Sequence, residues 1–151
     1  MRRAAVQITP SPMIAATLRA RVERIAEIVE ALVEGPAEVA YRRLTPPERA
    51  AVVRSWIDLV ADAFESGSLA DGLERAESYG RGHGLAGSSA EVTLGGSLAL
   101  ERAMERALAE GEAPLSQEQR IEAATAMGQL TVRVATAWAA AVAGRGGRAP
   151  G

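Results

Sequence analysis

His83 is the only histidine of the chain, and it lies in the glycine-rich stretch 79–96, YGRGHGLAGSSAEVTLGG. Histidine is the one side chain whose ordinary pKa lies near neutrality, so His83 is the first candidate for chemistry. Three roles are open to it: a solvent-facing loop residue, a buried histidine hydrogen-bonded to the backbone, or a ligand of haem or of another small molecule. If the chain has a site, we expect it in this stretch, with Tyr79 and His83 as candidate ligand-binding residues.

Catalysis by His83 would need a nucleophile or an orienting partner placed beside it by the fold. Ser88 and Ser89 follow closely, but serine at this point is typical of the cap of a helix that starts at residue 90. The sequence lacks the G-x-S-x-G and H-E-x-x-H patterns, and the G-x-G at 82–84 follows no predicted strand. We therefore expect no enzyme. The alternative is a small helical enzyme whose pocket lies around Tyr79, His83 and Glu91.

Composition restricts the classes of partner that the protein can bind and the compartment in which we expect it. The 151 residues include 17 Lys and Arg and 19 Asp and Glu, which are mixed along the chain and form no basic stripe for nucleic acid. Cysteine is absent, which excludes disulfides, cysteine-ligated zinc and thiol catalysis, and no tight cluster of metal-ligating residues is visible. Neither a signal-peptide core nor an apolar run of about 20 residues is present. We expect no membrane span and a cytoplasmic protein.

Helical periodicity dominates the chain, and no segment shows the alternation of a half-buried strand. Ser-Pro at 11–12 and the capping box T-P-P-E at 45–48 mark two helix starts. We expect helices over 12–33, 37–43, 46–65, 69–81, 90–110 and 117–143. The predicted fold class is all-α, a single domain of five to six helices over 11–144, with a flexible arm at 1–10 and a flexible tail at 145–151.

Glycines are expected to end some of these helices and to lie inside another. Those at 80, 82, 84 and 87 are expected to end the helix 69–81, and Gly144 to end the last helix. Gly95 and Gly96 instead fall inside the predicted helix 90–110, where each glycine costs roughly 1 kcal/mol relative to alanine. Two adjacent glycines there indicate either the close approach of another backbone or the wall of a cavity. Both are therefore candidate ligand-binding residues.

The helix predicted over 117–143 is rich in alanine and carries few charges. An extended face of small, uncharged residues is typical of a contact surface between proteins. We therefore expect a homodimer. Its interface is predicted on this helix at Met127, Leu130, Val134, Ala137, Trp138 and Ala141.

The order of these elements resembles the N-terminal globin-like sensor domains of bacterial stress-signalling proteins of the RsbR type. The similarity covers 13–143 and lies in pattern and length: a helix with the start L-T-P-P-E, a glycine-broken segment, a helix with small residues and a long last helix. It extends to the sensor globins that precede kinase or cyclase modules. The resemblance implies a globin-like helical bundle.

One local match concerns haem. In haem-binding sensor globins a glycine stands about four residues after the proximal histidine and another about twelve residues after it, and His83, Gly87 and Gly95 match this spacing. On that register His83 would be the axial ligand, and Gly87 is a further candidate ligand-binding residue. The distal aromatic residue of the pattern falls near Glu30, and large side chains are few, so the non-haem branch of the family fits better. We expect no cofactor, with a haem-binding sensor globin as the alternative.

The resemblance also implies a function. Non-haem domains of this kind are regulatory, sense or transmit a signal as dimers, and are coupled to an output protein. For this chain we expect a ligand or partner to bias the packing of the helices 90–110 and 117–143. That change would then reach the C-terminus.

Overall fold

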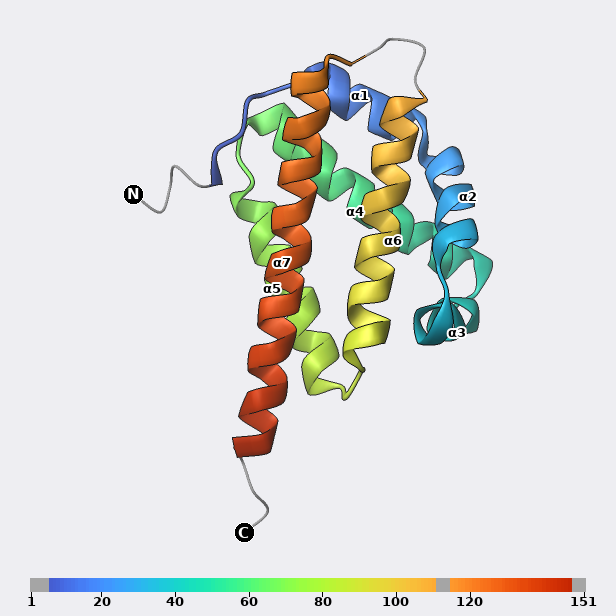
Figure 1. Ribbon diagram of the computed structural model, residues 1–151, viewed down its shortest axis with the longest axis vertical. Coiled ribbons are helices and arrows are strands. Elements are labelled where there is room, and N and C mark those ends of the chain that lie inside the picture. Colours follow the sequence, from blue (N-terminus) through green and yellow to red (C-terminus); the bar gives the residue numbers. More distant parts are fainter. Residues whose placement is uncertain (1–5, 111–114, 148–151) are drawn as a thin grey trace.

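The computed structural model describes residues 6–110 and 115–147, and every regular element longer than a single bridge within them is an α-helix (Figure 1). The predicted all-α class is confirmed. These residues form seven helices rather than five to six: α1 (Pro12–Ala20), α2 (Val22–Leu32), α3 (Gly35–Arg43), α4 (Pro46–Ser66), α5 (Ala70–Leu85), α6 (Ala90–Ala109) and α7 (Gln117–Gly147). In the described part of the chain, each helix is too short or too polar to span a lipid bilayer.

The additional helix arises because the segment 12–33 is not one element. The chain turns at Arg21, where φ is −114° and ψ is 23°, and the Arg21 N–H donates to the carbonyl of Leu18. Before the turn, α1 packs mainly on α4; after the turn, α2 packs mainly on α6. Leu18 and Ile25, on either side of the turn, are both fully buried. The change of direction therefore lets one apolar stripe cover two different helices.

Helix α4 lies at the centre of the core. The predicted capping box is present: the Thr45 hydroxyl accepts from the Glu48 N–H at 3.3 Å, and the Glu48 carboxylate accepts from the Thr45 N–H at 3.0 Å. Along the helix Val53, Ile57 and Phe64 are fully buried. Gly67 ends the helix in the left-handed region, at φ 76°. The capping box thus determines where α4 begins, and the apolar face of α4 is the surface on which the neighbouring helices pack.

Helix α7 packs against both α5 and α6, and it lies in front of α5 in the view of Figure 1. The prediction that α5 ends at Arg81 is wrong, because the helix continues through Gly82 and Gly84 to Leu85. A Cβ atom at Gly84 would lie 2.7 Å from the Ala141 Cβ and 2.9 Å from the Trp138 carbonyl oxygen. The glycines of α5 therefore permit a close parallel contact with α7 and do not break the helix.

The last helix also runs further than predicted. Gly144 does not end α7, which continues to Gly147. The Arg145 guanidinium donates to the Gly84 carbonyl at 3.1 Å, which ties the last turns of α7 to the end of α5. The predicted flexible tail at 145–151 thus begins inside a helix, and 148–151 lie outside the described residues.

Residues 6–10, which were expected in a flexible arm, are held by the turn between α4 and α5. The Ile8 N–H donates to the Gly67 carbonyl at 3.0 Å, and the Leu69 N–H donates to the Val6 carbonyl at 2.6 Å. The Thr9 N–H donates to the Glu122 carboxylate of α7. Residues 1–5 of the predicted arm lie outside the described residues.

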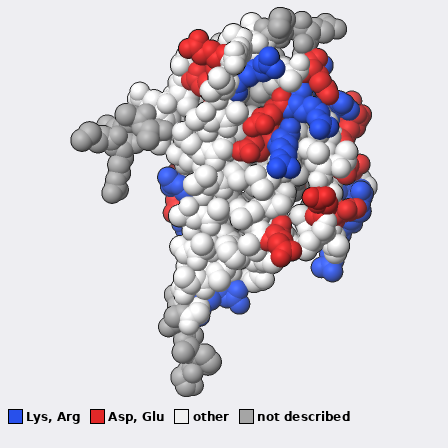
Figure 2. Space-filling view, viewed as in Figure 1, with Lys and Arg blue, Asp and Glu red and all other residues white. Residues whose placement is uncertain are grey.

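Charged side chains are unevenly spread over the surface. Figure 2 shows them gathered over the side of α6 and α2, while most of the face above α7 carries none. Between Ala123 and Ala143 the only charged residue is Arg133, which pairs with Glu77 of α5 at 3.5 Å. The outward face of α7 is therefore largely uncharged.

Candidate functional site

An apolar cavity of about 260 Å³ lies among α2, α3, α4, α5 and α6, and we call it the His83 cavity. Its aliphatic walls come from Val29, Val33, Leu44, Val52, Val92 and Leu100. Three side chains with polar atoms, Tyr41, Tyr79 and His83, complete the lining together with Ala37, Ala40 and Gly96. None of the described residues that line the cavity is charged. Such a concave, apolar space with a few polar groups is the usual form of a small-molecule site.

Tyr79 and His83 reach the cavity together because they lie one turn apart on α5. Their ring centroids are 4.3 Å apart, and the Trp56 ring meets the Tyr79 ring edge-on at 5.6 Å. This placement requires α5 to stay helical through residue 83. The pairing of these two residues was predicted from the sequence, but on a segment expected to leave the helix at Arg81.

The two glycines of α6 have different surroundings. A Cβ atom at Gly95 would lie 2.9 Å from the Ala37 Cβ, so this glycine permits the close contact of α6 with α3. At Gly96 no atom lies within 4 Å of the same position, and the residue lines the His83 cavity. Of the two roles that the sequence left open, Gly95 permits the close approach of another helix and Gly96 forms part of a cavity wall.

Gly87 does not belong to the cavity. It is exposed in the turn between α5 and α6, at φ 82°, and a Cβ atom there would lie 3.4 Å from the Arg145 guanidinium. A left-handed turn residue explains the glycine without a ligand. Of the five predicted ligand-binding residues, the structure brings Tyr79, His83 and Gly96 together and leaves Gly87 and Gly95 outside the lining.

His83 connects the cavity to α7 through Ser88. The His83 Nδ1 and the Ser88 hydroxyl are 3.1 Å apart, and the Ser88 carbonyl accepts a hydrogen bond from the Trp138 indole at 2.9 Å. Ser89, and not Ser88, caps α6 by accepting from the Val92 N–H at 3.2 Å. The two serines thus have different roles: Ser89 caps α6, and Ser88 contacts the His83 ring.

Burial sets the protonation of the polar lining. It lowers the pKa of the His83 imidazole and raises the pKa of the Tyr79 hydroxyl. The pKa of Tyr41 is raised first by burial and then by the Glu30 carboxylate. At neutral pH all three side chains are therefore uncharged, so the cavity offers neutral donors and acceptors.

Haem does not fit this cavity. Pockets for drug-sized ligands measure about 300–1,000 Å³, and haem is larger than such ligands, whereas the His83 cavity measures about 260 Å³. The Tyr79 ring lies against the His83 ring, with the two centroids 4.3 Å apart. The cavity and its side chains suit a ligand smaller than haem.

The alternative enzyme pocket is not assembled. Glu91 is exposed and lines a separate depression with Glu34 and Leu94, away from the cavity lined by Tyr79 and His83. His83 and Ser88 are within hydrogen-bond distance, but among the described residues no acidic side chain bonds to the other ring nitrogen to orient it. Nor do the described residues contain a group of three or more potential metal ligands.

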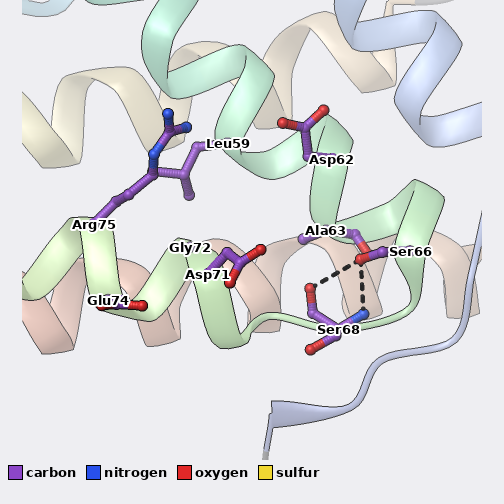
Figure 3. A pocket seen from close by; sticks show the side chains of 9 residues that line it. All are labelled: Leu59, Asp62, Ala63, Ser66, Ser68, Asp71, Gly72, Glu74 and Arg75. Carbon is purple, nitrogen blue, oxygen red and sulfur yellow. Dashed lines mark hydrogen bonds between the residues drawn. The ribbon is translucent and has the colours of Figure 1, made fainter.

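Figure 3 shows a second hollow, of about 420 Å³, at the turn between α4 and α5. Three of its polar side chains, Ser66, Ser68 and Asp62, already serve the fold. Ser66 and Ser68 hydrogen-bond across the turn, and Asp62 pairs with Arg19 of α1. Asp71, Glu74 and Arg75 border the same hollow. The hollow is polar, and its polar groups at the turn are engaged with one another, so it is a weaker candidate than the His83 cavity.

Most of the predicted interface residues lie inside the chain's own core. Met127, Leu130 and Val134 are at most 2% exposed, and Ala137 is 9% exposed. Trp138 and Ala141 are half-buried against the end of α5. The exposed large apolar residues of α7 are instead Ile121 and Val132. The homodimer itself stays a prediction.

The sequence did not identify the side of the cavity formed by α2 and α3. Val33, Ala37, Ala40, Tyr41 and Leu44 all line it. Part of this wall had a signal in the sequence, because Ala40 and Tyr41 follow Ala37 at three and four residues and share one face of α3 with it. What the spacing could not show is that this face covers Tyr79 and His83.

No protein-family model matches this chain, and no curated protein or solved structure matches it significantly. The candidate site therefore rests on the geometry of this chain.

Proposed function

We propose that this chain is a non-enzymatic sensor domain, in which a small molecule bound in the His83 cavity alters the packing of α7. The observation that carries the proposal is the line of contacts from the cavity wall to the C-terminal helix. His83 lines the cavity, its Nδ1 meets the Ser88 hydroxyl at 3.1 Å, and the Ser88 carbonyl accepts from Trp138 at 2.9 Å. A group that moves or reorients His83 therefore acts on a residue of α7.

The contact between α5 and α7 favours transmission as well. Gly80 and Gly84 bring the two backbones together without intervening side chains, and Arg145 bonds to the Gly84 carbonyl. Closely packed helices shift as units rather than deform locally. A ligand that favours one position of α5 would thus bias the position of the last turns of α7.

The signal would pass from α7 to a partner. We propose a homodimer through the largely uncharged outward face of α7 between Ala123 and Ala143, on which Val132 is 64% exposed. An output protein of a signalling pathway, bacterial stress signalling in the resemblance drawn above, would respond to the change in the cytoplasm.

The link between His83 and Trp138 can be tested without knowing the ligand. We would follow the two tryptophan indole N–H signals by NMR during a pH titration, with Trp138→Phe for assignment. The Trp138 signal is expected to shift with the same midpoint as the His83 ring signals, because protonation of His83 changes its bond to Ser88.

Two variants serve as controls for this experiment. His83→Gln removes the titrating group, and Ser88→Ala removes the hydroxyl while keeping the carbonyl that Trp138 uses. Both are expected to abolish the shift of the Trp138 signal. A Trp138 signal that ignores the titration of His83, or that shifts equally in both variants, would overturn the proposed transmission.

A further inference from the structure

We propose that the His83 cavity selects a small, neutral, largely apolar molecule with one ring or two fused rings and one hydrogen-bonding group. This inference deepens the proposed function and rests on it. Size is the first argument: an apolar cavity of about 150 Å³ holds benzene, and drug-sized ligands need about 300 Å³ or more. The His83 cavity, at about 260 Å³, lies between these limits.

The lining excludes charged ligands. It contains no Lys, Arg, Asp or Glu, and burial lowers the pKa of its only histidine, so no opposite charge is available. The Arg49 guanidinium lies over the Tyr41 ring, 5.7 Å from its centroid, and is paired with the Glu30 carboxylate at 3.7 Å. Moving a carboxylate or phosphate from water into such a space is strongly unfavourable.

Polar atoms in the lining select one hydrogen-bonding group. Among the described residues, no hydrogen bond engages the hydroxyls of Tyr41 and Tyr79 or the Nε2 of His83. These atoms are not fully buried either, since the described residues contain no buried side-chain polar atom without a partner. They therefore remain accessible, and each of them can donate to or accept from a polar group on the ligand.

Gly96 is the residue that keeps this space open. It lies inside α6, where glycine is unfavourable compared with alanine, yet no neighbouring helix requires its small size. Its neighbour Gly95 is explained by the contact with Ala37, whereas Gly96 faces only the cavity. A glycine with no packing role beside an apolar space is what a ligand site requires.

Indole is a suitable probe because it is neutral, bicyclic and carries one N–H donor. We would measure its binding by calorimetry and by methyl NMR of the cavity valines, with toluene, benzoate and phenyl phosphate for comparison. Indole is expected to bind saturably at one site and more tightly than toluene, and the two anions are expected not to bind. Wild-type protein that binds no indole, or binds benzoate equally well, would overturn the inference.

A matched pair of glycine variants locates the binding. Gly96→Leu places its side chain in the cavity, while Gly82→Leu places the same side chain at an exposed position of α5 with no atom within 4 Å. We expect Gly96→Leu to weaken indole binding at least about ten-fold and Gly82→Leu to leave it unchanged. If Gly96→Leu fails to fold, Gly96→Val is judged by the same criterion. Equal affinity in the Gly96 and Gly82 variants would contradict the assignment.

The same samples separate this inference from the proposed function. Indole that binds in the cavity but leaves the Trp138 indole signal unmoved would refute the transmission to α7 and support the ligand class. Loss of indole binding in the Gly96 variant, with a wild-type response of Trp138 to the titration of His83, would support both.

Discussion

Gly80 of α5 and Val134 of α7 touch through their backbones, since a Cβ atom at Gly80 would overlap the carbonyl oxygen of Val134. Gly84 repeats the contact one turn later against Trp138 and Ala141. This contact keeps α5 helical as far as His83 and sets that histidine between the cavity and α7. The stability of the fold and the position of the candidate site therefore depend on the same glycines.

The first prediction compares two glycines of α5. Gly80→Ala should lower the free energy of unfolding by roughly 2–3 kcal/mol, because the new methyl group must displace the backbone of α7. Gly82→Ala should raise it by up to about 1 kcal/mol, because that position faces open space in a helix interior. Urea denaturation measures both values. Equal effects of the two substitutions would contradict the α5–α7 contact.

The second prediction concerns the adjacent glycines of α6. Gly96→Ala should stabilise the protein by up to about 1 kcal/mol, since its methyl group meets nothing within 4 Å. Gly95→Ala should destabilise it by about 1–3 kcal/mol, since its methyl group would lie 2.9 Å from the Ala37 Cβ. Thermal and urea unfolding can rank the two variants against the wild type. The reverse order would show that α3 does not pack on α6 at this point.

The third prediction concerns pH. Burial lowers the pKa of His83 in the folded protein below its value of about 6.5 in an unfolded chain. The unfolded chain therefore binds the proton more readily, so the free energy of unfolding should fall as the pH drops below that value. Only well above about pH 6.5 is the histidine neutral in both states, and there it should have no such effect.

His83→Gln provides the reference for this measurement. Burial raises the pKa of Glu101, which acts in the opposite direction as the pH falls, but Glu101 is common to both proteins. Urea denaturation of the wild type and of His83→Gln between about pH 7 and pH 5 should show the steeper loss in the wild type. Parallel curves would mean that His83 titrates normally in the folded state.

A fourth prediction concerns haem. Added haemin should give no Soret band that depends on His83, because the cavity of about 260 Å³ is too small for the macrocycle. Absorption spectra of the wild type and of His83→Ala, recorded with equal amounts of haemin, make the comparison. A sharp band present only in the wild type would restore the haem alternative.

The fifth prediction tests the homodimer. Val132 is 64% exposed on the uncharged face of α7, so Val132→Glu should place a charge in the interface and shift the protein towards the monomer. Val39→Glu is the matched control, because Val39 is 57% exposed on α3, away from α7. Sedimentation velocity over a range of concentrations reports the oligomeric state. A wild type that stays monomeric at high concentration refutes the dimer.

The sequence by itself determined the helical class, most helix starts and much of the core. The starts at Pro12, Pro46 and Ala90 follow from local hydrogen bonds of Ser11, Thr45 and Ser89, which lie within a few residues of the groups they cap. Helical periodicity depends only on neighbours along the chain, so it also predicted the helices whose apolar residues, Ile57 and Phe64 among them, form much of the core. The pairing of Tyr79 with His83 and the two possible roles of Gly95 and Gly96 were also visible.

Only the tertiary structure decided which role each residue takes. A glycine in a helix is unfavourable locally, so the sequence predicted that α5 would end at Arg81, whereas the contact of Gly80 and Gly84 with α7 outweighs that cost. The turn at Arg21 and the burial of Leu130 and Val134 depend in the same way on helices distant in the chain. The His83 cavity is a space between five helices, and such a space exists only once their packing is fixed.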